Sequence, residues 1–306
     1  MREKKIRRLI NDLDVKIVKK GHKSIYGKII YYILGIALSL TFLFPIFYMI
    51  AASTKSPTAL VKEASEGSLM MFIPDFSNPA HMFDNYKILF GEHHLGEYAL
   101  NSLIYAAITI VLNILVNGMA AYAISKLRFP GKKFFNFIII FLMVVPVETS
   151  IIPLLIVCQE MLHLVGNLSI VGVILPGTIS IFNIFLFIQF FSSIPKEFEE
   201  AARMDGANTL GVFFKVILPL SKPILATVAV FCFIGVWNDY LWPMMVLEKE
   251  SMYPIQAALE TIKTTEGVTD GQKMASLVVT TIPIFIIYIA AQKYIVKGFG
   301  AGGLKI

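Results

Sequence analysis

Six long hydrophobic runs alternate with shorter polar segments along the chain. The runs cover Ile29–Ala52, Tyr98–Ile124, Phe134–Val157, Leu168–Phe191, Pro219–Val246 and Ala275–Val296. Each is long enough for an α-helix to cross the hydrocarbon core of a bilayer, which takes about 20 residues. The pattern predicts an all-α integral membrane protein with six transmembrane helices. It divides the chain into a polar N-terminal segment, residues 1–28, and a six-helix membrane domain, residues 29–306.

Most of these runs contain prolines, which interrupt the hydrogen bonding of a helix. They are Pro45, Pro146, Pro153, Pro176, Pro223, Pro243 and Pro283. Inside a bilayer, a backbone carbonyl freed by a proline needs another partner. The breaks therefore indicate helices that pack in a bundle or line a cavity. The alternative for any one proline is an ordinary tolerated kink.

One polar segment, residues 192–219, separates the fourth run from the fifth. It predicts two short helices joined at Gly206. Ser193 can cap the first helix, with Pro195 in its opening turn. Three glutamates then lie near the positive end of the helix dipole, where negative charge is favoured: Glu197, Glu199 and Glu200.

The second short helix of this segment has its own start and stop signals. Asn208 or Thr209 can cap it, and Pro219 is expected to end it. Small residues would let another surface approach the backbone closely: Ala201, Ala202, Gly206 and Ala207. The segment is either a docking surface for a partner or an amphipathic loop that rests on the membrane.

The charge distribution gives the orientation of the predicted helices. The 306-residue chain is 56% hydrophobic and only 16% charged, with a net charge of +6. Of its 27 Lys and Arg residues, 21 lie on one side of the six runs, together with both termini and the 192–219 segment. Because basic residues concentrate in cytoplasmic loops, this side is expected to be cytoplasmic. The same mapping explains the positive charge without a nucleic-acid partner.

The two longest segments on the opposite side are residues 53–97 and 247–274. The first segment contains the aromatic residues Phe72, Phe76, Phe83 and Tyr86, which favour packed short helices on the outer surface. For both segments, the alternative is a solvated connection.

Motifs for self-contained chemistry are missing from the sequence. It contains no glycine-rich Gly-Lys-Ser/Thr phosphate loop, no His-Glu-x-x-His pair and no Gly-x-Ser-x-Gly elbow. The two cysteines, Cys158 and Cys232, have neither a disulfide framework nor metal-ligand spacing. We therefore expect a protein that is not an enzyme, has no catalytic residue, resident cofactor or metal, and takes its energy from a partner.

Polar residues inside the runs are costly in lipid and usually face protein or water. Glu148, Asn183 and Asn238 are the candidates for lining a path taken by a hydroxyl-rich solute. Ser180 and Asn183 are expected to share one helix face because they are three residues apart. The alternative is interhelical hydrogen bonding, with an aromatic belt at the outer interface around Trp237–Tyr240.

The spacing of the 192–219 segment resembles a known motif. Glu200-Ala201-Ala202 is followed by three residues, then Gly206, nine residues and Val216-Ile217-Leu218-Pro219. This resembles the EAA loop of permeases from bacterial binding-protein-dependent ABC importers, which have Ile where Val216 stands. Three further segments resemble the carbohydrate-uptake branch and are similar to the second (G-type) permease of the maltose system: Tyr122–Gly131, Trp237–Pro243 and Gln292–Gly298.

The resemblance implies a type I ABC importer permease fold and a docking role for the hairpin. As the family's coupling helix, it would contact a cytoplasmic ATPase through Glu200, Ala201, Ala202, Asp205 and Gly206. The implied partners are a second homologous permease subunit, two cytoplasmic ATPase subunits that bind ATP, an extracellular solute-binding protein, a sugar substrate and membrane lipid. The implied location is the plasma membrane of a bacterium, as a multi-pass protein with both termini cytoplasmic.

The leading hypothesis for function is therefore import of a sugar or oligosaccharide. Within transport, the alternative is another solute, such as a polyol or glycerol phosphate. A different class would be a membrane-embedded enzyme that acts on lipid-linked sugars, and a third is a structural membrane scaffold. The family pattern gives no role for the charge of Glu148.

Overall fold

The computed structural model describes the backbone of residues 25–77, 79–166 and 169–303. Every regular element in these ranges is a helix, which confirms the predicted all-α fold. The chain divides into two units, residues 1–49 and residues 50–306. Most of the predicted basic N-terminal segment, and Lys305 in the tail, lie outside the described residues.

The first unit contains most of helix α2, Ile25–Ser53. The described side chains of this unit are largely exposed, and nearly all of them are apolar. A helix that is hydrophobic on every face is typical of a membrane span. The helix continues through Pro45, so this proline is a tolerated one.

Two further helices of the second unit run without a break over a length that can span a membrane. They are α5, Leu95–Lys126, and α16, Asp270–Gly303. At 1.5 Å per residue, the 32 residues of α5 extend over about 48 Å. Helix α5 thus reaches from the outer segments to the 192–219 segment.

The remaining predicted spans are bent pairs of helices rather than single helices. Helix α6 (Lys132–Leu142) meets the helical segment that follows it at an angle of 100°. This segment consists of η2 (Val147–Ser150), α7 (Ile151–Ile156) and the π-helical η3 (Val157–Met161). Helices α8, Ser169–Gly177, and α9, Ile181–Ser193, meet at 41°. The predicted breaks are confirmed in both runs, because Pro146 and Pro176-Gly177 lie where the backbone turns.

The bounds of the fifth predicted span, Pro219–Val246, are corrected. Helix α13, Lys222–Asn238, follows the 192–219 segment after a bend of 83° at Ser221. It ends at Asn238, and a separate short helix α14, Leu241–Val246, begins beyond Asp239. The last proline of this run, Pro243, therefore lies in α14 and not inside a membrane-crossing helix.

Both long outer segments fold into short helices, as the aromatic residues predicted for the first. They contain α3, Pro57–Ser65; η1, Leu69–Phe72; α4, Asp84–Gly91; η5, Glu250–Met252; and α15, Ile255–Thr264. The buried ammonium group of Lys55 pairs with the Glu63 carboxylate and donates to Met70 O at 2.7 Å. Ser102 Oγ of α5 accepts a hydrogen bond from Ile255 N at 2.7 Å. The Lys55 contacts hold the first outer segment together, and the Ser102 bond ties α15 of the second outer segment to α5.

Trp237 belongs to the core and not to an interfacial belt. Its side chain is fully buried, its ring stacks on Phe233 at 5.2 Å between centroids, and its Nε1 donates to Thr280 O at 3.0 Å. The alternative of an aromatic belt at the outer interface is therefore wrong for Trp237. Buried Tyr and Trp side chains usually satisfy their polar atom in this way.

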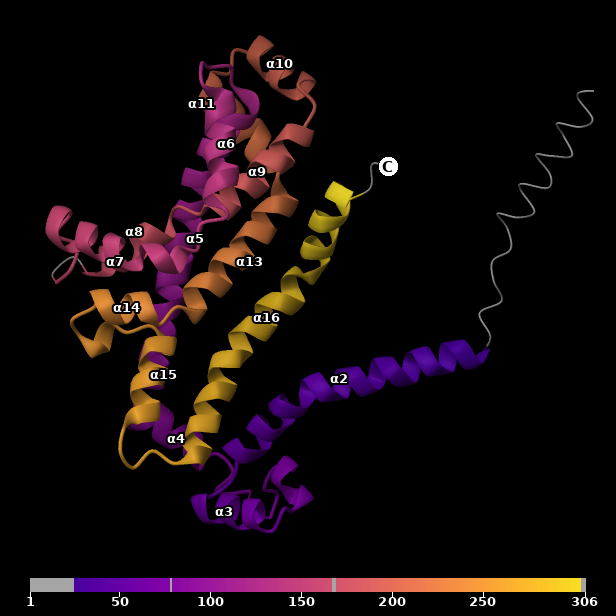
Figure 1. Ribbon diagram of the computed structural model, residues 1–306, viewed down its shortest axis with the longest axis vertical. Helices are drawn as coiled ribbons and strands as arrows, with labels where there is room; N and C mark the ends of the chain where they lie inside the picture. The colour runs from indigo at the N-terminus through magenta and orange to yellow at the C-terminus, as the bar shows by residue number, and fades with distance from the viewer. Residues whose placement is uncertain (1–24, 78, 167–168, 304–306) are drawn as a thin grey trace, which may run out of the picture. The chain divides into compact units, whose positions relative to one another are not determined.

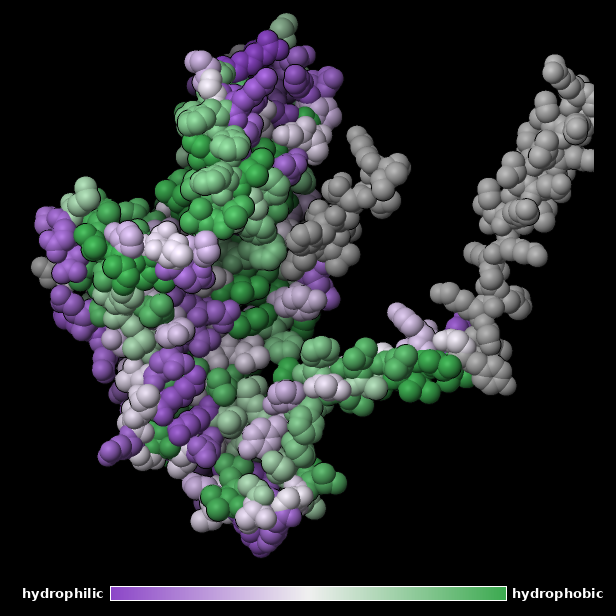
Figure 2. All heavy atoms as spheres, in the orientation of Figure 1, coloured by the Kyte–Doolittle hydropathy of each residue, from purple (hydrophilic) through white to green (hydrophobic). Residues whose placement is uncertain are grey.

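The hairpin of the 192–219 segment and the outer helices lie at opposite ends of the second unit (Figure 1). The hairpin contains α10, Glu197–Met204; α11, Thr209–Val212; the π-helical η4, Phe213–Ile217; and α12, Leu218–Leu220. Hydrophilic residues gather over α10, and hydrophobic ones cover the neighbouring surface below it (Figure 2). This division agrees with a hairpin in water next to helices in lipid.

Candidate functional site

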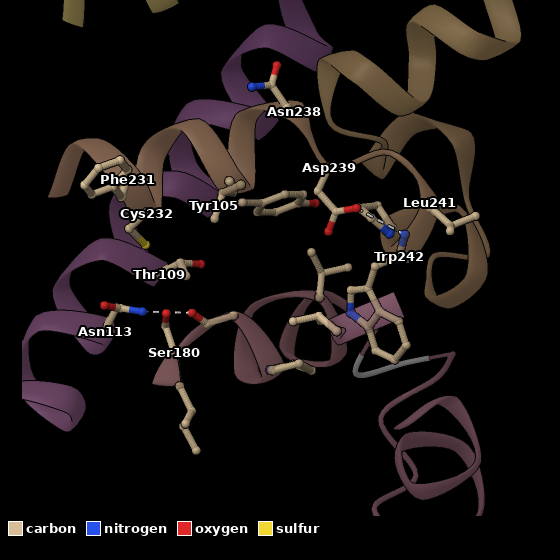
Figure 3. Close-up of a pocket in the computed structure, with 18 of the residues that line it drawn as sticks. Tyr105, Thr109, Asn113, Ser180, Phe231, Cys232, Asn238, Asp239, Leu241 and Trp242 are labelled. Carbon is tan, nitrogen blue, oxygen red and sulfur yellow. Dashed lines mark hydrogen bonds between the residues drawn. The ribbon is translucent and has the colours of Figure 1, made fainter. Parts of the chain in front are cut away.

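A cavity of about 730 Å³ lies between α5, α8, α9, α13 and α14, with η2 and α7 completing its wall (Figure 3). Its volume is within the range of small-molecule sites in proteins. The wall is mainly apolar and carries a few polar side chains: Tyr105, Thr109, Asn113, Glu148, Ser180, Asn183, Asn238 and Asp239. The breaks at Pro146 and Pro176-Gly177 and the turn after Asn238 each place a helix end at the wall of this cavity.

Two asparagines of α5 form hydrogen bonds with the backbone between the end of α8 and the start of α9. Asn113 Nδ2 donates to Gly177 O at 3.2 Å, and Asn117 Nδ2 donates to Thr178 O at 3.1 Å. Asn117 Oδ1 accepts from Ser180 N at 3.1 Å. Backbone groups freed inside a membrane need such partners. These two asparagines therefore make the interhelical hydrogen bonds that were the alternative for polar residues inside the runs.

Asn183 is buried and borders the cavity from α9. Its Nδ2 donates to Asn113 Oδ1 at 2.9 Å, while its Oδ1 accepts no hydrogen bond from any residue that the structure describes. Ser180 is the N-cap of α9, and its Oγ accepts from Asn183 N at 3.3 Å. The prediction that Ser180 and Asn183 share a helix face is wrong, because the helix begins between them.

The turn between α13 and α14 brings a carboxylate to the cavity. Asp239 Oδ1 accepts a hydrogen bond from Trp242 N at 3.3 Å. Asp239 lies beside Tyr105, whereas Asn238 points away from both (Figure 3). Asn238 Oδ1 faces Gln256 Nε2 at 3.4 Å. Asn238 therefore lies at the border of the cavity with its side chain turned outward.

The structure thus places the three predicted path residues, Glu148, Asn183 and Asn238, around one cavity. Their role in translocation stays a prediction. Sequence reasoning missed Asp239 and Tyr105 as separate candidates. An acid inside a hydrophobic run is itself the signal that could have identified Asp239.

Close packing of α8 against α14 fixes one wall of the cavity. Trp242 Nε1 donates to Gly172 O at 3.0 Å. A Cβ atom added at Gly172 would lie 2.8 Å from both Leu164 O and Val246 Cγ1. Both contacts are too short, and because Leu164 O belongs to the backbone, the contact with it can be relieved only by a backbone shift, so glycine is required here.

Replacing Gly172 by alanine is expected to destabilise the protein by about 1–3 kcal/mol, the usual penalty of overpacking a close contact. The measurement is the unfolding temperature of the purified protein in detergent. Gly235→Ala is the matched control, because a Cβ atom at Gly235 meets no atom within 4 Å and alanine favours a helix. Equal unfolding temperatures for the two variants would contradict the packing argument.

The second candidate site is the hairpin. Four of the predicted docking residues are exposed: Glu200, Ala201, Asp205 and Gly206. Ala202 is half-buried against the hydrophobic cluster inside the chain. The small size of Ala202 therefore serves packing within this chain. The docking role of the exposed residues stays a prediction.

The boundaries of the hairpin helices differ in part from those predicted. Asn208 caps α11, and its Oδ1 accepts from Gly211 N at 2.7 Å, as predicted. Ser193 instead ends α9, since its Oγ donates to Phe190 O at 2.7 Å. Pro219 lies within α12, and the helix breaks at Ser221. A proline in the first turn of a helix needs no hydrogen bond from its nitrogen, so it does not end α12.

A buried ion pair anchors α10 to the end of α5. Lys126 Nζ lies 3.1 Å from Glu199 Oε1, without the alignment of a hydrogen bond, and the two side chains are only 5% and 11% exposed. Lys126 Nζ also donates to Ile194 O at 2.5 Å. Sequence reasoning noted both charges but did not pair them, because 73 positions separate them along the chain.

The exposed face of the hairpin also carries large apolar side chains. Met204 is 88% exposed, and Phe198 and Leu210 are 48% and 58% exposed. Apolar groups beside acidic ones at the end of a protein are typical of a surface that binds a partner. These three residues were not predicted as part of the docking surface.

Comparison with known proteins identifies the family. Residues 118–300 match the family described as "Binding-protein-dependent transport system inner membrane component". The chain belongs to this family. The matched residues include the whole hairpin and every residue of the cavity wall that follows Asn117 in the sequence. The predicted family of ABC importer permeases is therefore confirmed.

Curated relatives of this permease have similar lengths. The "Arabinooligosaccharides transport system permease protein AraQ" of Halalkalibacterium halodurans is 32% identical over 86% of this chain and 91% of that protein. The "Polygalacturonan/rhamnogalacturonan transport system permease protein YtcP" of Bacillus subtilis is 30% identical over 85% of this chain and 92% of that protein. Both are named as transport permeases.

A solved structure shares the fold of this permease. It is a chain from the "Crystal structure of a bacterial ABC transporter involved in the import of the acidic polysaccharide alginate", with 31% identity and a TM-score of 0.74. The match covers 90% of this chain and 98% of that chain. The fold is therefore that of an ABC importer permease, an inner-membrane protein with several apolar helices.

Proposed function

We propose that this permease is a membrane subunit of an ATP-driven importer that moves a sugar or oligosaccharide into a bacterial cell. The observation that carries the proposal is the cavity between the broken spans, which holds amide, hydroxyl and carboxylate groups beside aromatic rings. Such a wall suits a solute with many hydroxyl groups, because each polar group can hydrogen-bond one. The relatives named for arabinooligosaccharides and polygalacturonan support this substrate class.

The exposed surfaces of the chain agree with an assembled importer. Helix α6 exposes large apolar side chains, which suits lipid or a second homologous permease: Phe134, Phe137, Ile140 and Phe141. The hairpin presents Phe198, Met204 and Glu200 to one of two cytoplasmic ATPase subunits. The outer helices α3, α4 and α15 offer a surface to an extracellular solute-binding protein.

In this arrangement the permease has no catalytic residue, and ATP is hydrolysed by the partner subunits. Both chain termini and the hairpin lie in the cytoplasm. Movement of the ATPases is transmitted through α10 and its ion pair to α5, which forms one wall of the cavity. A connection of this kind lets hydrolysis on one side of the membrane change access to the solute cavity.

Reconstituting the complete importer in proteoliposomes, with its solute-binding protein, is expected to give ATP-dependent uptake of a radiolabelled oligosaccharide. The substrate is chosen by a thermal-shift screen of the binding protein against neutral oligosaccharides, oligouronates, polyols and glycerol phosphate. Omitting this chain is expected to abolish uptake. An importer with an ATPase variant that cannot hydrolyse ATP is the control.

Three results would contradict the proposal. Uptake of glycerol phosphate or a polyol, but of no sugar, would establish the alternative solute class. Turnover of a lipid-linked sugar by this chain without an ATPase would make it an enzyme. Purification of the chain without any ATPase partner would favour a scaffold.

A further inference from the structure

The charge of the cavity wall distinguishes between classes of sugar. Among the described residues that line it, the charged side chains are the carboxylates Glu148 and Asp239, and none is Lys, Arg or His. Neither carboxylate forms an ion pair with another residue that the structure describes. The wall therefore carries uncompensated negative charge from two different broken spans.

The buried amide of Asn183 adds an independent observation. Asn183 is one of the residues that line the cavity, and its Oδ1 is shielded from solvent and has no partner among the described residues. A buried acceptor without a donor costs free energy, so it favours a ligand that supplies one. The amide cannot turn to present its Nδ2 instead without losing the hydrogen bond to Asn113 Oδ1.

Asp239 and Glu148 thus present hydrogen-bond acceptors to the cavity, and Asn183 holds an unpaired acceptor just behind its wall. A sugar hydroxyl can donate to each of them, whereas an ionised carboxylate or phosphate on the solute cannot. In a cavity with apolar walls, the field of fixed charges is also stronger than in water. Like charge is therefore repelled, while an uncharged polyhydroxyl solute is bound.

We propose that Glu148 and Asp239, together with Asn183, make this cavity a subsite for neutral saccharides and exclude anionic ones such as uronates and sugar phosphates. This inference rests on the proposed function, because it names the substrate class for the same cavity. Sequence similarity alone does not decide between neutral and anionic saccharides, since this chain is similar both to a relative named for arabinooligosaccharides and to one named for polygalacturonan. It also gives the charge of Glu148 a role.

The potential in the cavity can be measured with a thiol introduced at its wall. Ile179 borders the cavity and is 60% exposed, so Ile179→Cys provides the reporter. The native thiols, Cys158 and Cys232, are buried and are replaced by alanine. In the assembled importer, modification rates are compared for a cationic and an anionic methanethiosulfonate reagent, each normalised to its rate with 2-mercaptoethanol.

The cationic reagent is expected to react roughly tenfold faster than the anionic one, as for a cleft lined by one sign of charge. Glu148→Gln and Asp239→Asn should each lower this ratio, and together bring it close to one. Glu160→Gln is the matched control, because Glu160 lies in the same broken span but does not line the cavity. A ratio of one or less in the parent protein would overturn the proposal, as would a ratio that both variants leave unchanged.

Protection of the same thiol tests the substrate class directly. Arabinotriose is expected to slow the modification, and trigalacturonate is not, until Glu148→Gln and Asp239→Asn are combined. Equal protection by both trisaccharides in the parent protein would overturn the inference. Failure of the proposed function gives a different result, because uptake of every sugar would then be absent from proteoliposomes while the reagent ratio still reports the negative wall.

Discussion

Replacing Lys126 by methionine is expected to destabilise the permease by about 3–5 kcal/mol, because it leaves the buried carboxylate of Glu199 without a counter-charge. It also removes the donor to Ile194 O, at the point where α9 leads into the hairpin. The variant should unfold at a lower temperature in the purified importer. Any protein that assembles should hydrolyse ATP with little uptake, since α10 is no longer held to α5.

A double-mutant cycle separates the ion pair from other effects of these substitutions. Lys126→Met/Glu199→Met is expected to be more stable than Lys126→Met alone, because the unpaired charge is gone. Lys133→Met is the matched control, since Lys133 is an exposed base just beyond the same end of α5, and its effect should stay within about 0.5 kcal/mol. Additive effects of the two single substitutions would show that the pair does not couple α10 to α5.

Replacing Gly206 by valine is expected to reduce uptake by more than about tenfold while the protein remains in the membrane. Gly206 has a φ of +84°, a left-handed conformation that costs a residue with a Cβ roughly 1–2 kcal/mol. A Cβ atom at this position meets no atom of the chain within 4 Å. The added side chain therefore disturbs the turn and the surface offered to the ATPase, not the packing of the permease.

Gly267→Val is the matched control for this experiment. Gly267 has a φ of +86°, is exposed and also has free space around its Cβ position, but it lies at the outer end of the protein. This variant should keep most of its uptake. Gly206→Asn separates the disturbed turn from the disturbed docking surface, because asparagine tolerates the left-handed conformation but still adds a side chain to the surface. Equal loss of uptake in the two valine variants would contradict a docking role for Gly206.

Much of the cavity could not be predicted from the sequence. The hydrophobic runs indicated where helices lie, but not that the runs around Pro146, Pro176 and Ser221 bend by 41–100°. A proline is compatible with both a mild kink and a sharp break, and the packing of neighbouring helices selects between them. Asn113 and Asn117 decide the matter at one break, because they supply the hydrogen bonds that the open backbone needs.

The positions of the charged residues in the hairpin and the cavity could not be predicted from the sequence either. Glu199 reads as one of three acids in the first turn of a helix, yet its neighbours Glu197 and Glu200 are exposed while Glu199 is buried against Lys126. Asn238 and Asp239 are adjacent in sequence, but the turn after α13 directs them to different places. Local sequence does not contain the long-range contacts that make these choices.

The sequence by itself determined the class of protein, the number of hydrophobic runs and the family, because these depend on composition, run length and the local spacing from Glu200 to Pro219. It also determined the caps that depend on a few adjacent residues, such as Asn208. Only the tertiary structure decided which polar groups meet around the cavity and that Lys126 holds Glu199. Such contacts join residues far apart in the chain, and their free energy exists only once the helices have packed.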